Sequence, residues 1–533
     1  MKTLLLFTVL SVTIFGQLAP YSFNFNENIP DVINNFPVSE NPASNSISAI
    51  LIQGDTVWLG TSRGLSRSID GGNSWRNYYG TPEFGTENIS ALAYDKYSGT
   101  IWVSTAHSAT VAGGQTLPEG SGLRYSEDGG NTWKIVNQPL DNENDTLVVY
   151  GSNILRALPV TVAIQNIIYD IAITPGTVWI ASFAGGIRKS TDKGLTWQRV
   201  VLPPDYLNSV SPTDNLNFCM SPVPGRFCAE GYLNYRGFSI ISVNDSTLYA
   251  GTANGINKST DGGISWIKFN HQNQTNPISG NFVVGLAYKE GNENEIWAAT
   301  WRAEDQSEFY GVSYSSDGGT NWVTSLYGER VNNLVLSLDK VVAAGNNGIY
   351  KTNDLGQTWF QPGPIVDSKS KLSLRTSTFY SAGFAESGLT LYLGSADGLI
   401  KNSGISGIWQ PVWKIYFASQ PLESKTEAYA FPNPFSPKTE SVKIKYSTGG
   451  RQVPVTIRIF DFNMNFVKTV VQNAQRGNPA HVVNDTSIDG IGGVIDFWDG
   501  TNELGSVVPN GVYFYRIDAG DDKPVFGKIM VLQ

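Results

Sequence analysis

The stretch Ser68–Trp75, SIDGGNSW, places a carboxylate two residues after a hydroxyl, then a pair of glycines and an indole. The same pattern, with its aspartate, returns in SEDGGNTW (126–133), STDKGLTW (190–197), STDGGISW (259–266), SSDGGTNW (315–322) and TNDLGQTW (352–359). A seventh copy, NSGISGIW (402–409), has Gly404 where the others have aspartate. Such recurrence indicates one structural unit repeated along the chain.

Each copy closes a larger unit. A short β-type run that ends in small residues precedes the copy, as in TVWLGTSRGL (56–65), and another apolar run precedes that, as in ISAILIQ (47–53). Such runs, bounded by Gly, Asn, Asp and Ser, predict strands joined by turns. Each unit therefore reads as three strands, an aspartate turn and a fourth strand. Seven units over residues 47–417 predict an all-β fold, a seven-bladed β-propeller.

The repetition also indicates what the aspartates do. An aspartate in a turn can accept backbone N–H bonds, while a neighbouring hydroxyl and permissive glycines support the turn. Seven catalytic sites in one ring are hard to rationalise, whereas seven repeated turns are expected. A calcium loop of the EF-hand type is excluded because the later acidic ligands are missing, and we expect no metal site. We therefore interpret six aspartates as structural: Asp70, Asp128, Asp192, Asp261, Asp317 and Asp354.

These copies resemble the BNR/Asp-box motif, S/T-x-D-x-G-x-T/S-W. Families with this motif include sialidases, xyloglucan-active glucanases, sortilin-type receptors and photosystem assembly factors. The resemblance therefore implies a propeller fold and not one particular activity.

Composition and the N-terminus bear on location. The net charge of −9 argues against a nucleic-acid partner, because phosphates need lysine and arginine to neutralise them. Residues 1–16, MKTLLLFTVLSVTIFG, have Lys2, an apolar run and a final glycine, which predicts a signal peptide too short to span a membrane. No later run is long enough to span one, so we expect a secreted or cell-surface protein. In that setting Cys219 and Cys228 are predicted to form a disulfide.

Strand order predicts where ligands bind. Turns that join strands one to two and three to four lie at one end of the blades, the aspartate-turn face; the remaining connections lie at the other end, the insertion face. Four long insertions, 106–121, 137–166, 202–236 and 301–311, fall on the insertion face. Loops on a rigid scaffold concentrate binding groups.

The candidate ligand-binding residues of these insertions combine aromatic rings, carboxylates and arginines, which suit a carbohydrate or protein ligand. The alternative is that they are ordinary loop residues that pack on one another. WRAEDQSEFYG (301–311) is the favoured ligand-facing loop. The candidates are His107, Arg226, Tyr232, Arg236, Trp301, Arg302, Glu304, Asp305 and Tyr310.

A change of composition marks the tail. After a linker at 418–427, short β-type runs over 428–533 predict a small immunoglobulin-like β-sandwich. AFPNPF (430–435), FWDG (497–500), NGVYFYR (510–516) and FGKIMVL (526–532) resemble the C-terminal sorting domains of type IX secretion, whose immunoglobulin-like form is close to a domain of the flagellar hook-capping protein. The resemblance implies export by outer-membrane secretion machinery. The alternative is a merely accessory β-module.

Two functions follow from these features. The first is a secreted or cell-surface propeller that acts as a carbohydrate- or protein-binding or scaffolding module, without a cofactor and without an assigned catalytic residue. The alternative is a secreted glycoside hydrolase, sialidase-like or glucanase-like, with two carboxylates on the insertion face at a set separation. The sequence leaves the ligand open, and also how the ring closes: the lead segment 17–46 and WKIYFA (413–418) are both candidates.

Overall fold

Strands make up nearly all the regular structure of this chain. A computed structural model describes residues 39, 41–368, 374, 376–385, 388–404, 408–418, 427–438, 441–449, 451–477 and 493–533. Within these ranges the helical structure is one 3-10 turn, η1 (Leu233–Tyr235), and no helix there has the length and apolarity needed to cross a membrane. The predicted signal peptide lies outside the described residues.

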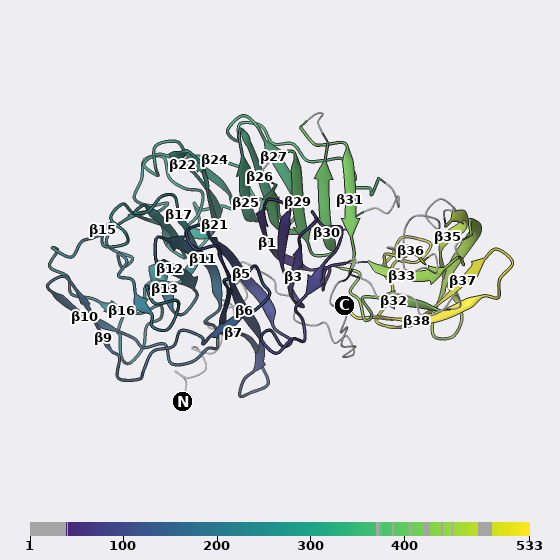
Figure 1. The fold of residues 1–533 in the computed structure, drawn as a ribbon, viewed down its shortest axis with the longest axis horizontal. Coiled ribbons are helices and arrows are strands. Elements are labelled where there is room, and N and C mark those ends of the chain that lie inside the picture. The colour runs from purple at the N-terminus through teal and green to yellow at the C-terminus, as the bar shows by residue number, and fades with distance from the viewer. Residues whose placement is uncertain are drawn as a thin grey trace.

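Seven antiparallel sheets follow one another around a ring (Figure 1). From the innermost strand outward, blade 1 is β1 (Ile47–Gln53), β2 (Thr56–Thr61), β3 (Gly64–Ser68) and β4 (Arg76–Asn77); blade 2 is β5 (Asn88–Asp95), β6 (Thr100–Thr110), β7 (Thr116–Ser126) and β8 (Lys134–Val136); blade 3 is β11 (Ile168–Thr174), β12 (Thr177–Ser182), β13 (Gly186–Ser190) and β14 (Gln198–Arg199). Blade 4 is β17 (Gly237–Ser242), β18 (Leu248–Thr252), β19 (Gly255–Ser259) and β20 (Trp266–Phe269); blade 5 is β21 (Phe282–Lys289), β22 (Asn292–Trp301), β23 (Gly311–Ser315) and β24 (Val323–Ser325). Blade 6 is β25 (Val331–Ser337), β26 (Lys340–Gly345) and β27 (Gly348–Thr352); blade 7 is β28 (Phe379–Phe384), β29 (Thr390–Ser395), β30 (Gly398–Ser403) and β31 (Val412–Tyr416).

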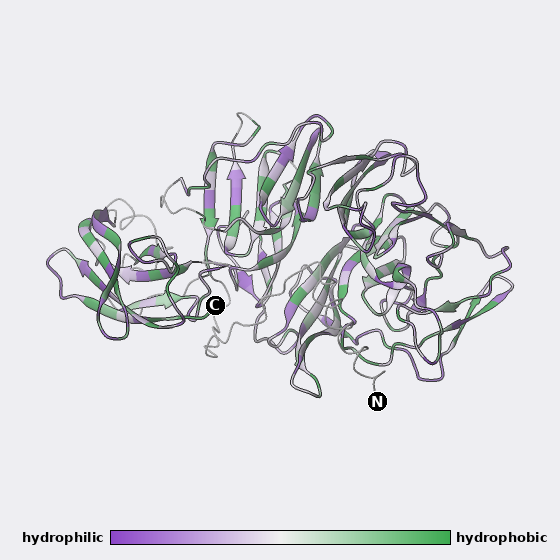
Figure 2. Ribbon diagram, turned by 180° about the vertical axis from the view of Figure 1, so that it is seen from behind, coloured by the Kyte–Doolittle hydropathy of each residue, from purple (hydrophilic) through white to green (hydrophobic). Residues whose placement is uncertain are grey.

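This arrangement confirms the predicted propeller, with two local differences. In blade 6 the place of the fourth strand is taken by a single bridge between Lys351 and Phe360. Blade 4 has a fifth strand, β15 (Ser209–Val210), paired with the outer edge of β20. Figure 2 shows hydrophobic and hydrophilic residues as short bands along the strands, and successive side chains of a strand face opposite sides of its sheet.

Large aromatic side chains fill the spaces between blades. Trp58 and Trp179, both from second strands, are almost fully buried. A Cβ atom added at Gly130 would lie 2.5 Å from the Trp58 ring, and one added at Gly263 would lie 2.4 Å from the Trp179 ring. The second glycine of an aspartate turn thus lets that turn approach the indole of the preceding blade.

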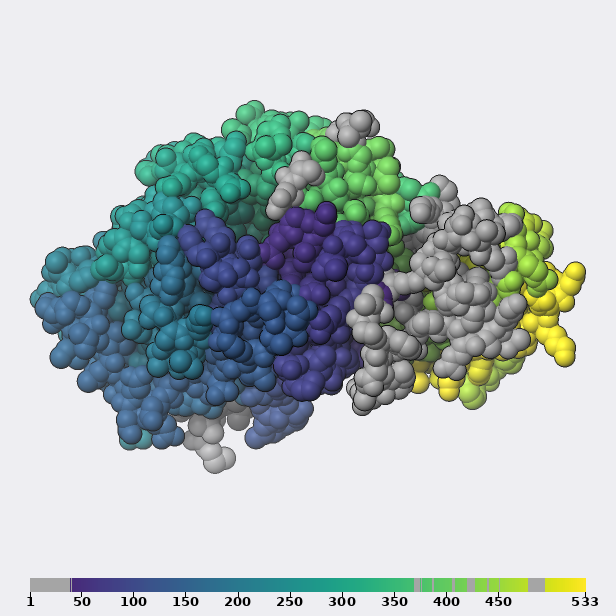
Figure 3. Space-filling view, viewed as in Figure 1, coloured from purple at the N-terminus to yellow at the C-terminus, as the bar shows by residue number. Residues whose placement is uncertain are grey.

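The ring closes by side-chain packing between blades 7 and 1, each made from its own segment. Tyr392 Oη and Lys401 Nζ both donate to the Gly71 carbonyl, at 2.9 and 2.8 Å, and Ser381 Oγ donates to the Ile47 carbonyl at 3.2 Å. Of the two proposed closing segments, WKIYFA supplies β31 of blade 7 itself. Of the lead segment 17–46 the structure describes Ser39 and residues 41–46, and Ser39 forms a bridge with Trp75 of blade 1. Figure 3 shows the first blade (purple) against the last (light green).

The tail forms a β-sandwich, as predicted. One sheet contains β32 (Ala428–Phe431), β33 (Val442–Ser447) and β36 (Gly493–Trp498); the other contains β35 (Phe466–Arg476), β34 (Val453–Phe460), β37 (Gly511–Ala519) and β38 (Val525–Val531). Its core includes Phe435, Trp498 and Tyr513, with the Trp498 ring 5.8 and 5.3 Å from the other two. Phe435, Trp498 and Tyr513, which belong to the tail motifs quoted from the sequence, thus form part of the hydrophobic core of the sandwich.

Candidate ligand-binding face

The aspartate turns are closed hydrogen-bond networks. Ser68 Oγ donates to Asp70 Oδ1 (2.7 Å) and accepts the Gly72 N–H (2.8 Å). Asp70 Oδ1 also accepts the Ser74 N–H (2.9 Å), and Asp70 Oδ2 accepts the Ser74 hydroxyl (2.6 Å). Equivalent bonds surround Asp128, Asp192, Asp261, Asp317 and Asp354.

These bonds favour the ionised carboxylate. The Thr196 hydroxyl lowers the pKa of Asp192 to about 2, and the Thr358 hydroxyl lowers the pKa of Asp354 to about 2. A carboxylate whose oxygens are occupied by its own turn is poorly placed to act as a general acid. This geometry agrees with a structural interpretation of the aspartates and directs attention to the opposite face.

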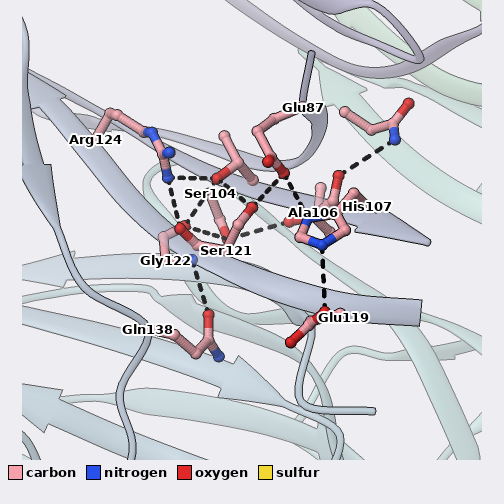
Figure 4. A network of polar contacts seen from close by, with 12 residues as sticks. Glu87, Ser104, Ala106, His107, Glu119, Ser121, Gly122, Arg124 and Gln138 are labelled. Atoms are coloured by element: carbon pink, nitrogen blue, oxygen red, sulfur yellow. Dashed lines mark hydrogen bonds and ion pairs between the residues drawn. The ribbon is translucent and has the colours of Figure 1, made fainter. Parts of the chain in front are cut away.

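On the insertion face of blade 2, a histidine lies between two carboxylates (Figure 4). His107 Nδ1 is 3.0 Å from Glu87 Oε2, and its Nε2 is 3.2 Å from Glu119 Oε2. The Ser121 hydroxyl donates to the same Glu87 oxygen, and the buried Arg124 donates to the Ser121 carbonyl at 2.8 Å. The His107 side chain is 40% exposed, so the network reaches solvent.

Most of the predicted insertion at 106–121 is therefore a pair of antiparallel strands and not a loop. β6 and β7 continue beyond the blade and pair as far as Thr110 and Thr116. This extension places His107 and Glu119 directly opposite each other on adjacent strands. Only the short tip between the two strands is irregular.

The two inter-blade insertions combine into an accessory sheet at the rim. β9 (Leu147–Tyr150) and β10 (Asn153–Ala157) form a hairpin, and β16 (Cys219–Met220) pairs in parallel with β10. The predicted disulfide between Cys219 and Cys228 is present. Tyr150 Oη donates to the Ile264 carbonyl (2.7 Å), inside the aspartate turn of blade 4. The insertions thus wrap the outer edge of the ring, which corrects the expectation that they stay on the insertion face.

Three sequence candidates lie in or beside the 202–236 insertion. Tyr232 is only 6% exposed and its hydroxyl donates to Glu230, so its assignment as a ligand contact is wrong: it packs the insertion. Arg236 is half-buried and donates twice to the Pro222 carbonyl, at 3.1 and 2.9 Å. Arg226, inside the disulfide-bonded loop, is exposed.

The favoured 301–311 loop is fastened to the body of the blade. Trp301 is 6% exposed and its Nε1 donates to the Val331 carbonyl (2.7 Å), so it is a core residue and not a ligand contact. The buried Glu308 accepts the Ala303 N–H (2.7 Å), which holds the loop down. The exposed residues of the loop are Arg302, Glu304, Asp305, Gln306 and Ser307.

An aromatic pair beside this loop escaped the sequence analysis. Tyr327, in the connection between blades 5 and 6, is 81% exposed, and its ring centroid is 4.6 Å from that of Phe309. Nearby, Arg330 lies 4.5 Å from the Tyr310 ring centroid and donates to the Tyr310 hydroxyl (2.9 Å). The connection 326–330 is short, so the length of an insertion could not identify it from the sequence. The available sequence signal was a tyrosine next to a glycine, Tyr327 and Gly328.

Comparison with known proteins supports the fold. No family model matches the chain. Over 219 residues it is 27% identical to the xyloglucanase Xgh74A of Acetivibrio thermocellus, which covers 40% of this chain and only 20% of that enzyme. An ancestral GH74 enzyme shares 14% identity with a TM-score of 0.50, over 92% of this chain and 62% of the enzyme. The YCF48 protein of Cyanidioschyzon merolae shares 15% identity with a TM-score of 0.41, over 69% and 98%. The likeness to the GH74 structure supports a β-propeller.

Proposed function

We propose that this chain is a secreted or cell-surface β-propeller of the Asp-box type that binds a carbohydrate on its insertion face. The exposed Tyr327, supported from one side by Phe309, is the observation on which the proposal rests. A sugar ring presents C–H groups that stack on such an aromatic face. The exposed Arg302, Glu304 and Asp305 lie on the loop that also carries Phe309 and supply hydrogen-bonding groups.

The test is a glycan array with the full chain, followed by calorimetry on any glycan that binds. We expect Tyr327→Ala to weaken binding by about tenfold or more, because stacking between rings contributes on the order of 1 kcal/mol and shields nearby hydrogen bonds from water. Tyr206→Ala is the matched control, since Tyr206 is an exposed tyrosine of another insertion. Unchanged affinity in Tyr327→Ala argues against this surface.

A glycoside hydrolase is the second candidate function, suggested by the xyloglucanase-like segment. A hydrolase needs one carboxyl group with a raised pKa next to a substrate cleft. In the described residues burial raises the pKa of Asp170 and Asp397; Asp170 lies in the central channel and Asp397 is enclosed next to Lys443. Glu87 and Glu119 are the alternative pair, both held by His107.

Sugar release from xyloglucan and sialosides by the full chain separates the two candidates. Under our proposal neither substrate is cleaved. Release that disappears in Glu87→Gln or Glu119→Gln, with folding retained, would establish the hydrolase instead.

For the tail, we propose a role in export across the outer membrane through type IX-like machinery. Its support is the resemblance of the phrases between residues 430 and 532 to sorting domains. Deletion of 428–533 in the native host is expected to leave the propeller in the periplasm, detected by fractionation. Undiminished export of the truncated chain would refute the role.

A further inference from the structure

The central channel of the propeller contains a cavity with a volume of about 370 Å³. All seven innermost strands line it. Tyr94, Lys96, Tyr97 and Tyr288 surround its opening on the aspartate-turn face, where first strands end. Toward the insertion face, the buried Phe238 packs against neighbouring rings, with centroids 5.7 Å from Tyr169 and from Phe282 and 6.0 Å from Phe183.

Polar side chains of the wall hydrogen-bond to backbone groups of the next blade. Ser239 Oγ donates to the Val283 carbonyl at 3.0 Å. In blade 6, Asn333 Oδ1 accepts the Ala382 N–H at 3.1 Å. In blade 3, Asp170 Oδ2 accepts the Ile240 N–H and its Oδ1 accepts the Ile171 N–H, both at 2.9 Å.

Asp170 occupies the same register position as Asn333, directly after the β-bulge of the innermost strand. A neutral amide therefore suffices for the link between blades, and the ionisable carboxyl of Asp170 is not needed for it. Asp170 is half-buried in the channel wall. Among the residues that the structure describes, no lysine or arginine forms an ion pair with it, whereas carboxylates withdrawn from bulk water are normally paired.

We propose that the central channel binds a small organic cation, with its ammonium group at the Asp170 carboxylate and its entry past the tyrosines of the opening. Two backbone N–H groups occupy one lone pair on each Asp170 oxygen, which leaves the others for the ligand. Tyrosine faces attract ammonium groups, and Tyr94 and Tyr97 are exposed at the entrance. A metal ion is a poorer fit, because the described residues contain no group of three acidic, histidine or cysteine ligands.

Among the described residues that line the channel, Lys96 is the one basic residue, and its Nζ lies over the Tyr97 ring at 5.2 Å from the centroid. The Tyr97 hydroxyl donates to Asp245 Oδ1 of blade 4 at 2.5 Å. This bond joins blades 2 and 4 across the end of blade 3 and narrows the entrance. A compact cation therefore fits better than a branched or polymeric one.

Calorimetry with choline and tetramethylammonium as probes tests the proposal on the full chain at pH 8. We expect saturable binding of one cation per chain, and no binding of 3,3-dimethyl-1-butanol, the neutral analogue of choline. Asp170→Asn should weaken binding by about tenfold or more, because a charge-assisted contact is lost, while Asp339→Asn, an exposed acid of the same face, should change nothing.

A measurement on the unaltered chain guards against a folding defect in Asp170→Asn. The charge of both probes is independent of pH, so any change in their affinity reports on the protein. Their affinity should rise from pH 6 to pH 8 as Asp170 ionises. Among the described residues of the lining, Asp170 is the one carboxyl group, and the other titratable residues are Lys96, Tyr94, Tyr97, Tyr169 and Tyr288. Absence of saturable binding by both probes overturns the proposal. Equal binding of the neutral analogue, or unchanged affinity in a folded Asp170→Asn, overturns it as well.

Discussion

At the scale of single residues, aspartate carboxyl groups of this propeller lie in two environments that shift their pKa in opposite directions. Asp192 lies in a turn that supplies hydroxyl and N–H donors, and its pKa falls to about 2. Burial in the channel wall raises the pKa of Asp170 to about 7, since two N–H bonds offset only part of the desolvation. Burial and the number of local hydrogen-bond donors together, and not the residue type, set the pKa of each carboxyl group.

Asp70→Ala should destabilise the propeller and leave ligand binding intact. The change removes the acceptor of the Ser74 hydroxyl and N–H. Both bonds are exposed, so water replaces part of what is lost and the expected cost is about 1 kcal/mol of unfolding free energy. Urea unfolding measures the cost. Asp339→Ala, an exposed acid on the same face, is the control and should cost almost nothing. Loss of binding with unchanged stability would return Asp70 to the list of functional residues.

Asp170→Asn should make the ligand-free chain more stable at high pH. Because the folded pKa of about 7 exceeds the ordinary aspartate pKa of 3.8 expected in the unfolded chain, the native state binds more protons between these pH values. The stabilising contribution of Asp170 is therefore full below about pH 4 and is lost as pH rises through 7, by about 4 kcal/mol. Unfolding midpoints at pH 4 and pH 8 should show a gain from the substitution at pH 8 only; equal midpoints at both would contradict it.

At the scale of elements, local periodicity explains which parts were predictable. Strands and aspartate turns follow from residues close in sequence, so the blades and the turns at Asp70 and its equivalents were predicted correctly. The path of the inter-blade insertions depends on distant contacts such as Tyr150 with Ile264, which no local pattern records. The sequence around Trp301 and Tyr232 does not distinguish them from exposed aromatic residues. Their burial follows from tertiary packing.

Removal of the disulfide should loosen the accessory sheet before the ring. The Cys219–Cys228 bridge closes a loop with a sequence separation of 9 residues, and such a bridge stabilises by about 2–3 kcal/mol. In Cys219→Ser/Cys228→Ser, hydrogen exchange should accelerate in β9, β10 and β16 while β11 to β13 stay protected. Exchange that accelerates equally in all blades would show that the insertions support the whole ring.

At the scale of the whole molecule, the propeller and the tail meet through a buried ion pair. Lys443 of β33 contacts Asp397, in the turn between β29 and β30, and both side chains are almost fully buried. The Lys443 ammonium also lies 4.7 Å from the Phe417 ring centroid. Desolvation raises the pKa of Asp397 and the neighbouring Lys443 opposes that rise. Since the contact joins two separate hydrophobic cores, it couples the position of the tail to blade 7.

Lys443→Met should therefore separate the tail from the propeller without unfolding either one. The change leaves Asp397 buried without its partner, and breaking one side of such a pair costs about 3–5 kcal/mol. Detachment of the tail relieves this cost, because Asp397 then regains water. Small-angle scattering should show a larger radius of gyration, and proteases should cut faster within 418–427.

Lys528→Met, which alters an exposed lysine of the same domain, should leave both measurements unchanged. Asp397→Leu combined with Lys443→Met removes both charges and should restore the compact form; if the double variant is as extended as Lys443→Met alone, the ion pair does not hold the two domains together.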